Sequence, residues 1–281
     1  MEPLKKFWIE LIKSGGAESE WWKRKKDLLA RRDVSVVRVN GRGYIFHRIR
    51  YDQSEKIYYQ LHLSMLLKQG DYFYLEEEIV PYQFRWEDGK IEEHRPVEVS
   101  WSNEPYEKLE LENEQSDRAM RFSYDRLAAV QYAERWWNSY NPAYRTFEVD
   151  CTNYVSQCLR AGGAPMRGTP NRNQGWWYQQ DNWSYSWAVA HSLRWFLSGS
   201  THGLKGTEVD SPEELSLGDI ICYDFEGDGR WNHNTIVVAK DIDGMPLVNA
   251  HTQNSRLRYW SYEDSSAWTP NIAYKFFRIG E

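Results

Sequence analysis

One cysteine and two histidines are the residues of this sequence that could perform nucleophilic chemistry. Cys151 lies near the middle of the chain, and His233 and His251 lie well downstream of it. A thiol that gives its proton to an imidazole becomes a thiolate, and a thiolate can attack a carbonyl carbon. These residue types therefore predict a cysteine nucleophile assisted by a histidine, provided that the fold brings them together.

The residues that follow Cys151 have the pattern of an amphipathic α-helix. Small or apolar side chains recur at helical spacing, namely Cys151, Tyr154, Val155, Cys158 and Leu159. Asp150 is a preferred N-cap residue, and Gly162 and Gly163 are expected to end the helix. The pattern therefore places Cys151 in the first turn of the helix.

A position in the first turn has consequences for the thiol of Cys151. Unpaired N–H groups and the helix dipole favour an anion there, so we expect a lowered thiol pKa. The Cys151 backbone N–H is also an expected donor to the oxyanion of a reacting carbonyl. The alternative interpretation is that Cys151 is a small apolar residue of the core.

The two histidines are expected on neighbouring antiparallel strands, and the turn between them decides whether they share a face. His233 begins one apolar run and His251 ends the next. A two-residue turn, Asp243-Gly244, would place them on opposite faces. A three-residue turn, 242–244, pairs Asp241 with Met245 and places His233 diagonally beside His251 on one face.

A helix-borne cysteine that faces a strand-borne histidine is the arrangement of papain-like cysteine amidases and peptidases. In these enzymes the thiolate attacks an amide carbonyl, the imidazolium protonates the leaving amine, and a third polar group orients the imidazole. Here the third group is expected from the row of Asn249, His251 and His233.

Three stretches of the sequence also resemble the bacterial putative amidase domain family, which is similar to the CHAP and cell-wall endopeptidase branches of the papain-like fold. They are Asp-Cys-Thr-Asn-Tyr-Val-Ser-Gln-Cys at 150–158, Leu-Gly-Asp-Ile-Ile at 217–221, and Gly-Arg-Trp-Asn-His at 229–233 with Asn-Ala-His-Thr at 249–252. The resemblance spans roughly residues 122–281 and leaves the first hundred residues unexplained.

The resemblance implies a role for each candidate catalytic residue. Cys151 would be the nucleophile, His233 the base and His251 the orienting residue, with Asn249 as the alternative for the last role. The implied activity is cysteine-dependent hydrolysis of an amide bond in a peptide or a peptidoglycan-like substrate of the cell wall, without a cofactor or a metal.

A long polar and aromatic segment, 164–185, is the expected wall of a substrate cleft, because long loops inside compact domains are usually functional. Trp176, Trp177 and Trp183 are its candidate substrate-binding residues. Asp150 and Asn153, beside the nucleophile, are assigned to the same role. The aromatic content of 16% is consistent with such a cleft, although most of these rings are expected in the core.

Two other classes of function remain open from the residues alone. A binding module could keep the fold and an aromatic cleft for a peptide or glycan without turnover. A metal site could combine Cys151 and Cys222 with the two histidines, although that spacing is not a recognised one. The net charge of −6 argues against a nucleic-acid partner.

The order of elements predicts an α+β chain. Residues 1–100 are expected to form an accessory domain of two helices and an antiparallel meander, with hairpin turns at 40–43 and 88–89. Residues 101–122 are the expected linker, and residues 123–281 the expected papain-like domain of helices on an antiparallel sheet. No transmembrane run or signal peptide is recognised, so the default localisation is cytoplasmic.

Overall fold

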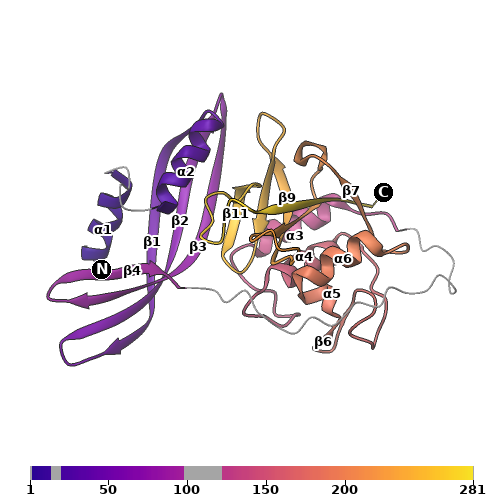
Figure 1. Cartoon of the computed structure of the whole chain (residues 1–281), viewed down its shortest axis with the longest axis horizontal. Helices are drawn as coiled ribbons and strands as arrows, with labels where there is room; N and C mark the ends of the chain where they lie inside the picture. The colour runs from indigo at the N-terminus through magenta and orange to yellow at the C-terminus, as the bar shows by residue number, and fades with distance from the viewer. Residues whose placement is uncertain (1, 14–19, 98–121, 281) are drawn as a thin grey trace. The chain divides into compact units, whose positions relative to one another are not determined.

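The computed structural model describes residues 2–13, 20–97 and 122–280, and the chain divides into two compact units. Unit 1 comprises residues 1–98 and 261–268, and unit 2 comprises residues 99–260 and 269–281. Each combines helices with antiparallel strands (Figure 1). The expected linker, 101–122, lies outside the described residues except for Phe122.

Unit 1 is built from two helices and a meander of four antiparallel strands. Its elements are α1 (Glu2–Lys13), α2 (Glu20–Arg31), β1 (Val34–Arg50), β2 (Ser54–Gln69), β3 (Tyr72–Glu87) and β4 (Lys90–Pro96). Each strand pairs with the next in the chain. The expected turn at 88–89 is confirmed, since Asp88 and Gly89 both have positive φ between β3 and β4.

The expected turn at 40–43 is wrong, because β1 continues through it. Gly41 lies opposite Leu63 and Gly43 opposite Leu61, within unbroken pairing to β2. The two glycines leave gaps in the row of side chains along β1, but the chain does not reverse its direction at them. The continuous apolar strand β2 therefore decides the pairing, and the local turn signal does not.

Unit 1 also buries an ion pair network in its core. The Lys25 ammonium on α2 contacts the Glu76 carboxylate on β3 and lies 3.0 Å from Asp264 Oδ2, and all three side chains are almost completely buried. The 261–268 segment is far in sequence from the rest of unit 1, and the ion pair of its Asp264 with Lys25 holds it there.

Unit 2 packs helices on one face of an antiparallel sheet. Its helices are α3 (Arg126–Trp136), α4 (Cys151–Ala161), α5 (Tyr185–Ala188) and α6 (Ala190–Gly199), with a 3-10 turn at Pro212–Glu214. The strands of the sheet are β7 (Gly206–Val209), β8 (Ile220–Asp224), β9 (His233–Lys240), β10 (Pro246–Ala250), β11 (Asn254–Tyr259) and β12 (Ala273–Ile279). Two short strands, β5 (Tyr178–Gln179) and β6 (Asn182–Trp183), form a separate hairpin.

The strand order in unit 2 is β11-β10-β9-β8-β12-β7, and each of these pairs is antiparallel. Helix α4 contributes Tyr154, Val155, Cys158 and Leu159 to a core that also contains Ile220, Cys222 and Ile236 from the sheet. This layer of helix against strand places the first turn of α4 beside the beginning of β9. The mixed α and β class with an antiparallel sheet agrees with the sequence prediction.

A β-bulge in the β9–β10 hairpin changes which residues share a face. The three-residue turn is confirmed, because the Asp241 N–H donates to Met245 O at 2.9 Å and Gly244 has a φ of 79°. Further along, Leu247 pairs with Ala239 but Val248 pairs with Val237, so Val238 is an extra residue on β9. A shift of one residue moves every later side chain to the other face relative to its partner.

Candidate active site

Cys151 is the first residue of α4, as the sequence predicts, and Asp150 is its N-cap residue. The Asp150 side chain makes no capping hydrogen bond to the helix. Instead, the hydroxyl of Thr252 accepts the Asp150 N–H at 3.0 Å and the Cys151 N–H at 3.1 Å. The expected oxyanion donor is therefore occupied by a threonine in this structure.

The sulfur of Cys151 is enclosed, because the residue has 0% exposure. It lies 3.7 Å from Thr152 Oγ1 and 4.0 Å from the Asn232 carbonyl oxygen. Burial raises the thiol pKa of Cys151, while hydrogen bonds from the Asn234 backbone and from the Thr152 and Thr252 hydroxyls oppose that increase. The expected lowered pKa is thus wrong for this structure, since desolvation of the thiolate outweighs the helix N-terminus.

Asp150 and His251 form a buried pair beside Cys151. The His251 Nδ1 atom lies 2.8 Å from Asp150 Oδ2, and its Nε2 donates to the Trp136 carbonyl at 2.8 Å. A carbonyl can only accept, and a carboxylate also accepts, so both ring nitrogens act as donors when Asp150 is ionised. The ring also stacks on Tyr154, with centroids 4.0 Å apart.

The other oxygen of the Asp150 carboxylate holds the segment that leads into α4. Asp150 Oδ1 accepts the Phe147 N–H and the Asn153 amide, both at 2.9 Å. Asn153 in turn donates to Arg145 O at 2.9 Å and accepts from the Trp187 indole at 2.8 Å. Asp150 and Asn153 are fully buried in contacts with the protein itself, so they support the helix and do not line a substrate cleft.

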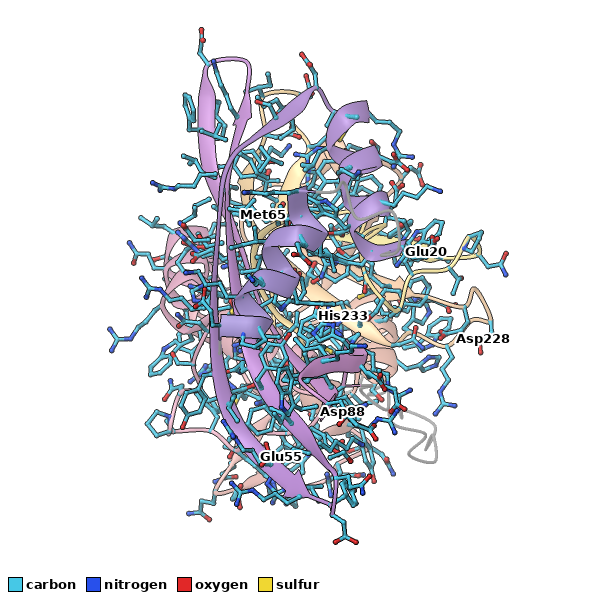
Figure 2. The ribbon with its side chains drawn as sticks, turned by 90° about the vertical axis from the view of Figure 1, so that its left-hand side faces the viewer. Glu20, Glu55, Met65, Asp88, Asp228 and His233 are labelled. Carbon is cyan, nitrogen blue, oxygen red and sulfur yellow. The ribbon has the colours of Figure 1, made fainter. Side chains whose placement is uncertain are left out.

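His233, labelled in Figure 2, is the first residue of β9. Its ring lies on the face of the hairpin opposite to Asn249. Asn249 lies opposite Ile236, an odd number of residues from His233, so the bulge separates the two histidines. The His233 ring packs against Tyr223 and Phe225, with centroid distances of 5.6 and 5.9 Å. Burial lowers the His233 pKa to about 3, and the nearby Arg258 charge acts in the same direction.

The expected row of Asn249, His251 and His233 is therefore not formed. Asn249 donates to Glu134 Oε1 at 2.8 Å and accepts the Leu257 N–H at 2.9 Å. Its amide supports α3 and β11. Neither residue expected to orient the His233 ring is on its side of the hairpin, because the sequence gives no local signal for the bulge at Val238.

The tryptophans expected in a substrate cleft belong mostly to the core. Trp176 and Trp177 are each 1% exposed. The Trp176 indole donates to Ser156 Oγ on α4 at 3.0 Å, and the Trp177 indole donates to the Asn171 carbonyl at 3.1 Å. Trp183 is half-buried and lies under the Arg172 guanidinium, 4.6 Å from the ring centroid. Of the three rings, only Trp183 therefore retains partial access to solvent.

Thr152 and Asn234 were missed by the sequence reasoning. Asn234 Nδ2 donates to Thr152 Oγ1 at 2.9 Å, and that oxygen lies 3.7 Å from the Cys151 sulfur. All three residues are buried. Asn234 follows His233 in a strand, so alternation alone places one of the two on the face of α4. The structure assigns that face to Asn234.

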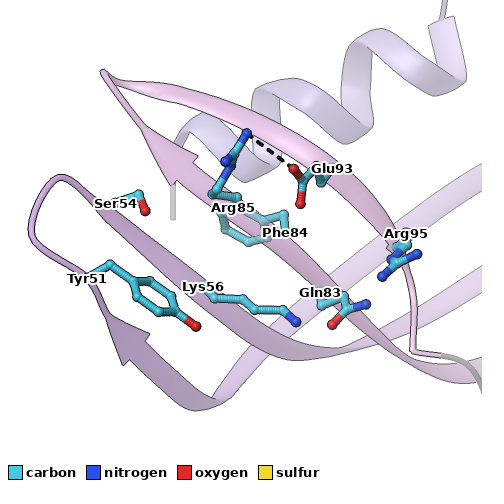
Figure 3. A pocket seen from close by; sticks show the side chains of 8 residues that line it. All are labelled: Tyr51, Ser54, Lys56, Gln83, Phe84, Arg85, Glu93 and Arg95. Carbon is cyan, nitrogen blue, oxygen red and sulfur yellow. Dashed lines mark ion pairs between the residues drawn. The ribbon is translucent and has the colours of Figure 1, made fainter.

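Unit 1 contains a separate hollow of about 340 Å³ between its strands (Figure 3). Lys56, Arg85 and Arg95 contribute charged side chains to its lining, and Arg85 pairs with Glu93 at 3.2 Å. The residues that line it include neither a cysteine nor a histidine. The hollow therefore lacks the cysteine and histidine side chains that characterise the candidate site of unit 2.

Within residues 2–13, 20–97 and 122–280, no group of three or more histidine, cysteine, aspartate or glutamate side chains is arranged to hold a metal ion. None of the described helices is long and apolar enough to cross a membrane. The site is thus described by its cysteine, its histidines and their hydrogen-bond partners.

Comparison with known proteins identifies the class to which this site belongs. Residues 123–277 match the family model described as a putative amidase domain. This match covers more than half of the chain and includes Cys151, His233 and His251. The chain therefore belongs to the putative amidase domain family, and this membership suggests hydrolysis of amide bonds.

Two proteins of Bacillus subtilis (strain 168) are similar in sequence to this chain. The chain is 50% identical over 263 residues to YhbB, described as an uncharacterized protein, and the match covers 91% of this chain and 85% of YhbB. It is 28% identical over 142 residues to YjcM, also described as uncharacterized, with coverages of 48% and 32%. No solved structure matches the chain. Since the YhbB match covers most of both chains, the resemblance to YhbB includes unit 1.

Proposed function

We propose that the protein is a cysteine-dependent hydrolase that cleaves an amide bond with Cys151 as its nucleophile. Membership in the putative amidase domain family supports the reaction class. The position of Cys151 is the observation that supports its role as the nucleophile. The Cys151 sulfur lies at the N-terminus of α4 and 4.0 Å from the carbonyl of Asn232, which directly precedes His233.

His233 is the better candidate for the base of the two histidines. His251 has one ring nitrogen on the Trp136 carbonyl and the other on the Asp150 carboxylate, so its lone pairs are not available for a proton from the thiol. Burial lowers the His233 pKa to about 3, so the ring is neutral at neutral pH but is a weak acceptor for a thiol proton. The ring also lies on the face of β9 away from α4, so proton transfer requires a rearrangement at the beginning of β9 that brings the ring to the sulfur and raises its pKa.

The proposed reaction has two steps. Cys151 gives its proton to His233, the sulfur attacks the amide carbonyl carbon, the C–N bond breaks, and the imidazolium protonates the leaving amine. Water then attacks the thioester with His233 as base, which releases the acid and restores the thiol. The substrate oxygen would replace the Thr252 hydroxyl on the Cys151 N–H, because both need the same donor.

The proposed substrate class is a peptide of the peptidoglycan type. The support is the likeness of residues 150–158 and 229–233 to a family that is similar to cell-wall endopeptidases. The half-buried ring of Trp183, with Arg172 and Arg145 at 4.6 and 5.3 Å, is the proposed contact for such a ligand. The cations above this ring suit an acidic peptide.

One observation favours a second candidate, a binding module without turnover. The Cys151 sulfur is fully enclosed, and its backbone N–H is bonded to Thr252. In a binding module, these contacts would be permanent. In a hydrolase, the substrate must displace Thr252.

A panel of amide substrates separates the two candidates. Purified protein, Cys151→Ala and His233→Ala are each incubated with peptide amides and with peptidoglycan fragments, and free amine is measured over time. The hydrolase predicts release by the unmodified protein that falls by about 10⁴-fold or more in Cys151→Ala. Cys158→Ala, which changes a buried cysteine of the core on α4, is the matched control and should retain turnover. Equal release from wild type and Cys151→Ala would exclude the proposal.

A further inference from the structure

The buried amide of Asn234 has one hydrogen-bond partner where its chemistry provides for more. Its Nδ2 donates to Thr152 Oγ1 at 2.9 Å, whereas its Oδ1 has no hydrogen-bond partner in the described part of the chain. Asn234 is 0% exposed. A buried polar atom without a hydrogen-bond partner destabilises the fold. The presence of asparagine at this position is therefore not explained by a gain in stability.

The neighbours of this amide point to the thiol. Thr152 Oγ1 accepts from Asn234, so the hydroxyl hydrogen of Thr152 remains available for another acceptor. The Cys151 sulfur lies 3.7 Å from that oxygen. Once the thiol has lost its proton, the sulfur can only accept, and the Thr152 hydroxyl is within reach to donate to it.

We propose that Asn234 and Thr152 are positioning residues of the nucleophile, acting as a hydrogen-bond relay from the Asn234 amide through the Thr152 hydroxyl to the Cys151 sulfur. The relay stabilises the thiolate inside a site that otherwise disfavours charge. This proposal rests on the proposed role of Cys151 and adds how a fully enclosed thiol is made reactive.

Other ionisable groups face the same sulfur. Asp150 on α4 disfavours the thiolate by its negative charge, and it is paired with His251 from the turn after β10. Cys222 on β8 interacts electrostatically with Cys151. His233 lies one residue from Asn234 on β9. The relay therefore acts against burial and the Asp150 charge, and a test must keep these groups unchanged.

The experiment measures the thiol pKa directly and uses no substrate. The ultraviolet absorbance of the thiolate is titrated against pH for each protein, and the titration of the same protein with Cys151→Ser is subtracted. Thr152→Val replaces the hydroxyl by a methyl group of the same shape, and Asn234→Leu removes the amide donor. Each is expected to raise the Cys151 pKa by about one pH unit, because a donor to a charged acceptor is lost.

Two control variants separate the hydroxyl from packing. Thr235→Val makes the same exchange one residue beyond Asn234, at a buried hydroxyl that contacts Tyr223 at 3.2 Å, and should leave the Cys151 pKa unchanged. Thr152→Ser keeps the hydroxyl and should also titrate like wild type. If Thr152→Val does not fold, Asn234→Leu compared with Thr235→Val decides the question.

Two outcomes overturn the relay. In the first, the Cys151 pKa of Thr152→Val and Asn234→Leu equals that of Thr235→Val. In the second, Thr152→Ser raises the Cys151 pKa as much as Thr152→Val does. The proposed function fails separately, since its test is amine release. If Thr152→Val and Asn234→Leu raise the Cys151 pKa but no amide is hydrolysed, the relay is supported and the hydrolase is excluded. If Cys151-dependent hydrolysis occurs but the variants leave the Cys151 pKa unchanged, only the relay is excluded.

Discussion

The two units of this protein bury charged and polar groups for different ends. In unit 1, Lys25 lies among the carboxylates of Glu76 and Asp264, and the network joins a helix, a strand and the 261–268 segment. In unit 2, the Cys151 sulfur lies 3.7 Å from the Thr152 hydroxyl, which accepts from Asn234, and the residue before Cys151, Asp150, pairs with His251. The buried charges of unit 1 join segments that are distant in sequence, whereas these buried polar groups of unit 2 lie next to a thiol.

The buried histidines show the same difference. In unit 1, His94 lies 2.6 Å from the Tyr59 hydroxyl and stacks on Tyr82, in an aromatic cluster without a nucleophile. In unit 2, His233 also packs against aromatic rings and is more completely buried than His94, yet the residues on either side of it contact the Cys151 sulfur or its neighbour. Burial lowers the pKa of both rings, so a perturbed pKa alone does not identify a catalytic base.

The largest expected effect on stability concerns Lys25. Lys25→Met leaves the carboxylates of Glu76 and Asp264 buried without their cation, so we expect a loss of about 3–5 kcal/mol in the free energy of unfolding. Urea unfolding followed by tryptophan fluorescence measures it. Lys23→Met, at an exposed position of the same helix, should change stability by less than about 0.5 kcal/mol. Equal effects of the two variants would contradict a structural network.

A smaller loss is expected at the corresponding pair of unit 2. His251→Leu leaves the Asp150 carboxylate buried without its partner, and we expect about 3 kcal/mol of destabilisation. Asp150 also keeps two other donors, Phe147 N and Asn153 Nδ2, which limit the loss. The measurement is the same urea titration, combined with amine release at a temperature where the variant is folded. Full stability in His251→Leu would show that the pair is not charged.

The histidines predict how stability depends on pH. The folded pKa values, about 4 for His94 and about 3 for His233, lie below the unfolded value of 6.5. The unfolded chain therefore binds more protons as the pH falls below 6.5, and stability is lost progressively until the folded pKa is reached. We expect a few kcal/mol in total between pH 6.5 and 4.

Substitution identifies which ring is responsible for this dependence. His94→Leu and His233→Leu should each flatten the stability curve between pH 6.5 and 4, measured by urea unfolding at several pH values. His202→Leu, at a half-buried position of the loop after α6, is the matched control. If neither buried histidine changes the slope, the depressed pKa values are contradicted.

The smallest effect tests the strand at Gly41. A β-carbon at Gly41 would meet only Leu61 Cδ1 at 3.6 Å and Leu63 Cδ1 at 4.0 Å, which are ordinary contacts. Gly41→Ala should therefore stabilise the protein by about 0.5 kcal/mol, because it restricts the unfolded chain. Gly89→Ala, at a φ of 78°, should destabilise it by about 1 kcal/mol. A loss of stability in Gly41→Ala would favour the turn over the strand.

Local patterns in the sequence predicted the elements on which the site depends. The helix begins at Cys151, as its apolar spacing and Asp150 indicate, and the turn before Met245 has its expected three residues. Both features follow from residues close in sequence. The position of the thiol at a helix N-terminus beside the first residues of β9 could therefore be anticipated.

The contacts inside the site could not be predicted, because they depend on registers and burial set by the whole unit. A single extra residue, Val238, moves His233 to the other face of the hairpin and brings Asn234 toward α4. Thr252, with a φ of 85°, takes the N–H groups that were expected to be open. Trp176 and Trp177 are residue types that often line a substrate cleft, but both are buried in the core.

Trapping an acyl group on the Cys151 sulfur during amide hydrolysis would identify the nucleophile. The protein is mixed with an amide substrate, quenched with acid within the first turnovers, digested and examined by mass spectrometry. We expect an acyl group on the peptide that contains Cys151, and no acyl group on the same peptide of Cys151→Ser treated identically. Turnover without any acyl group on Cys151, or with the group on Cys158 or Cys222, would contradict the role of Cys151 as the nucleophile.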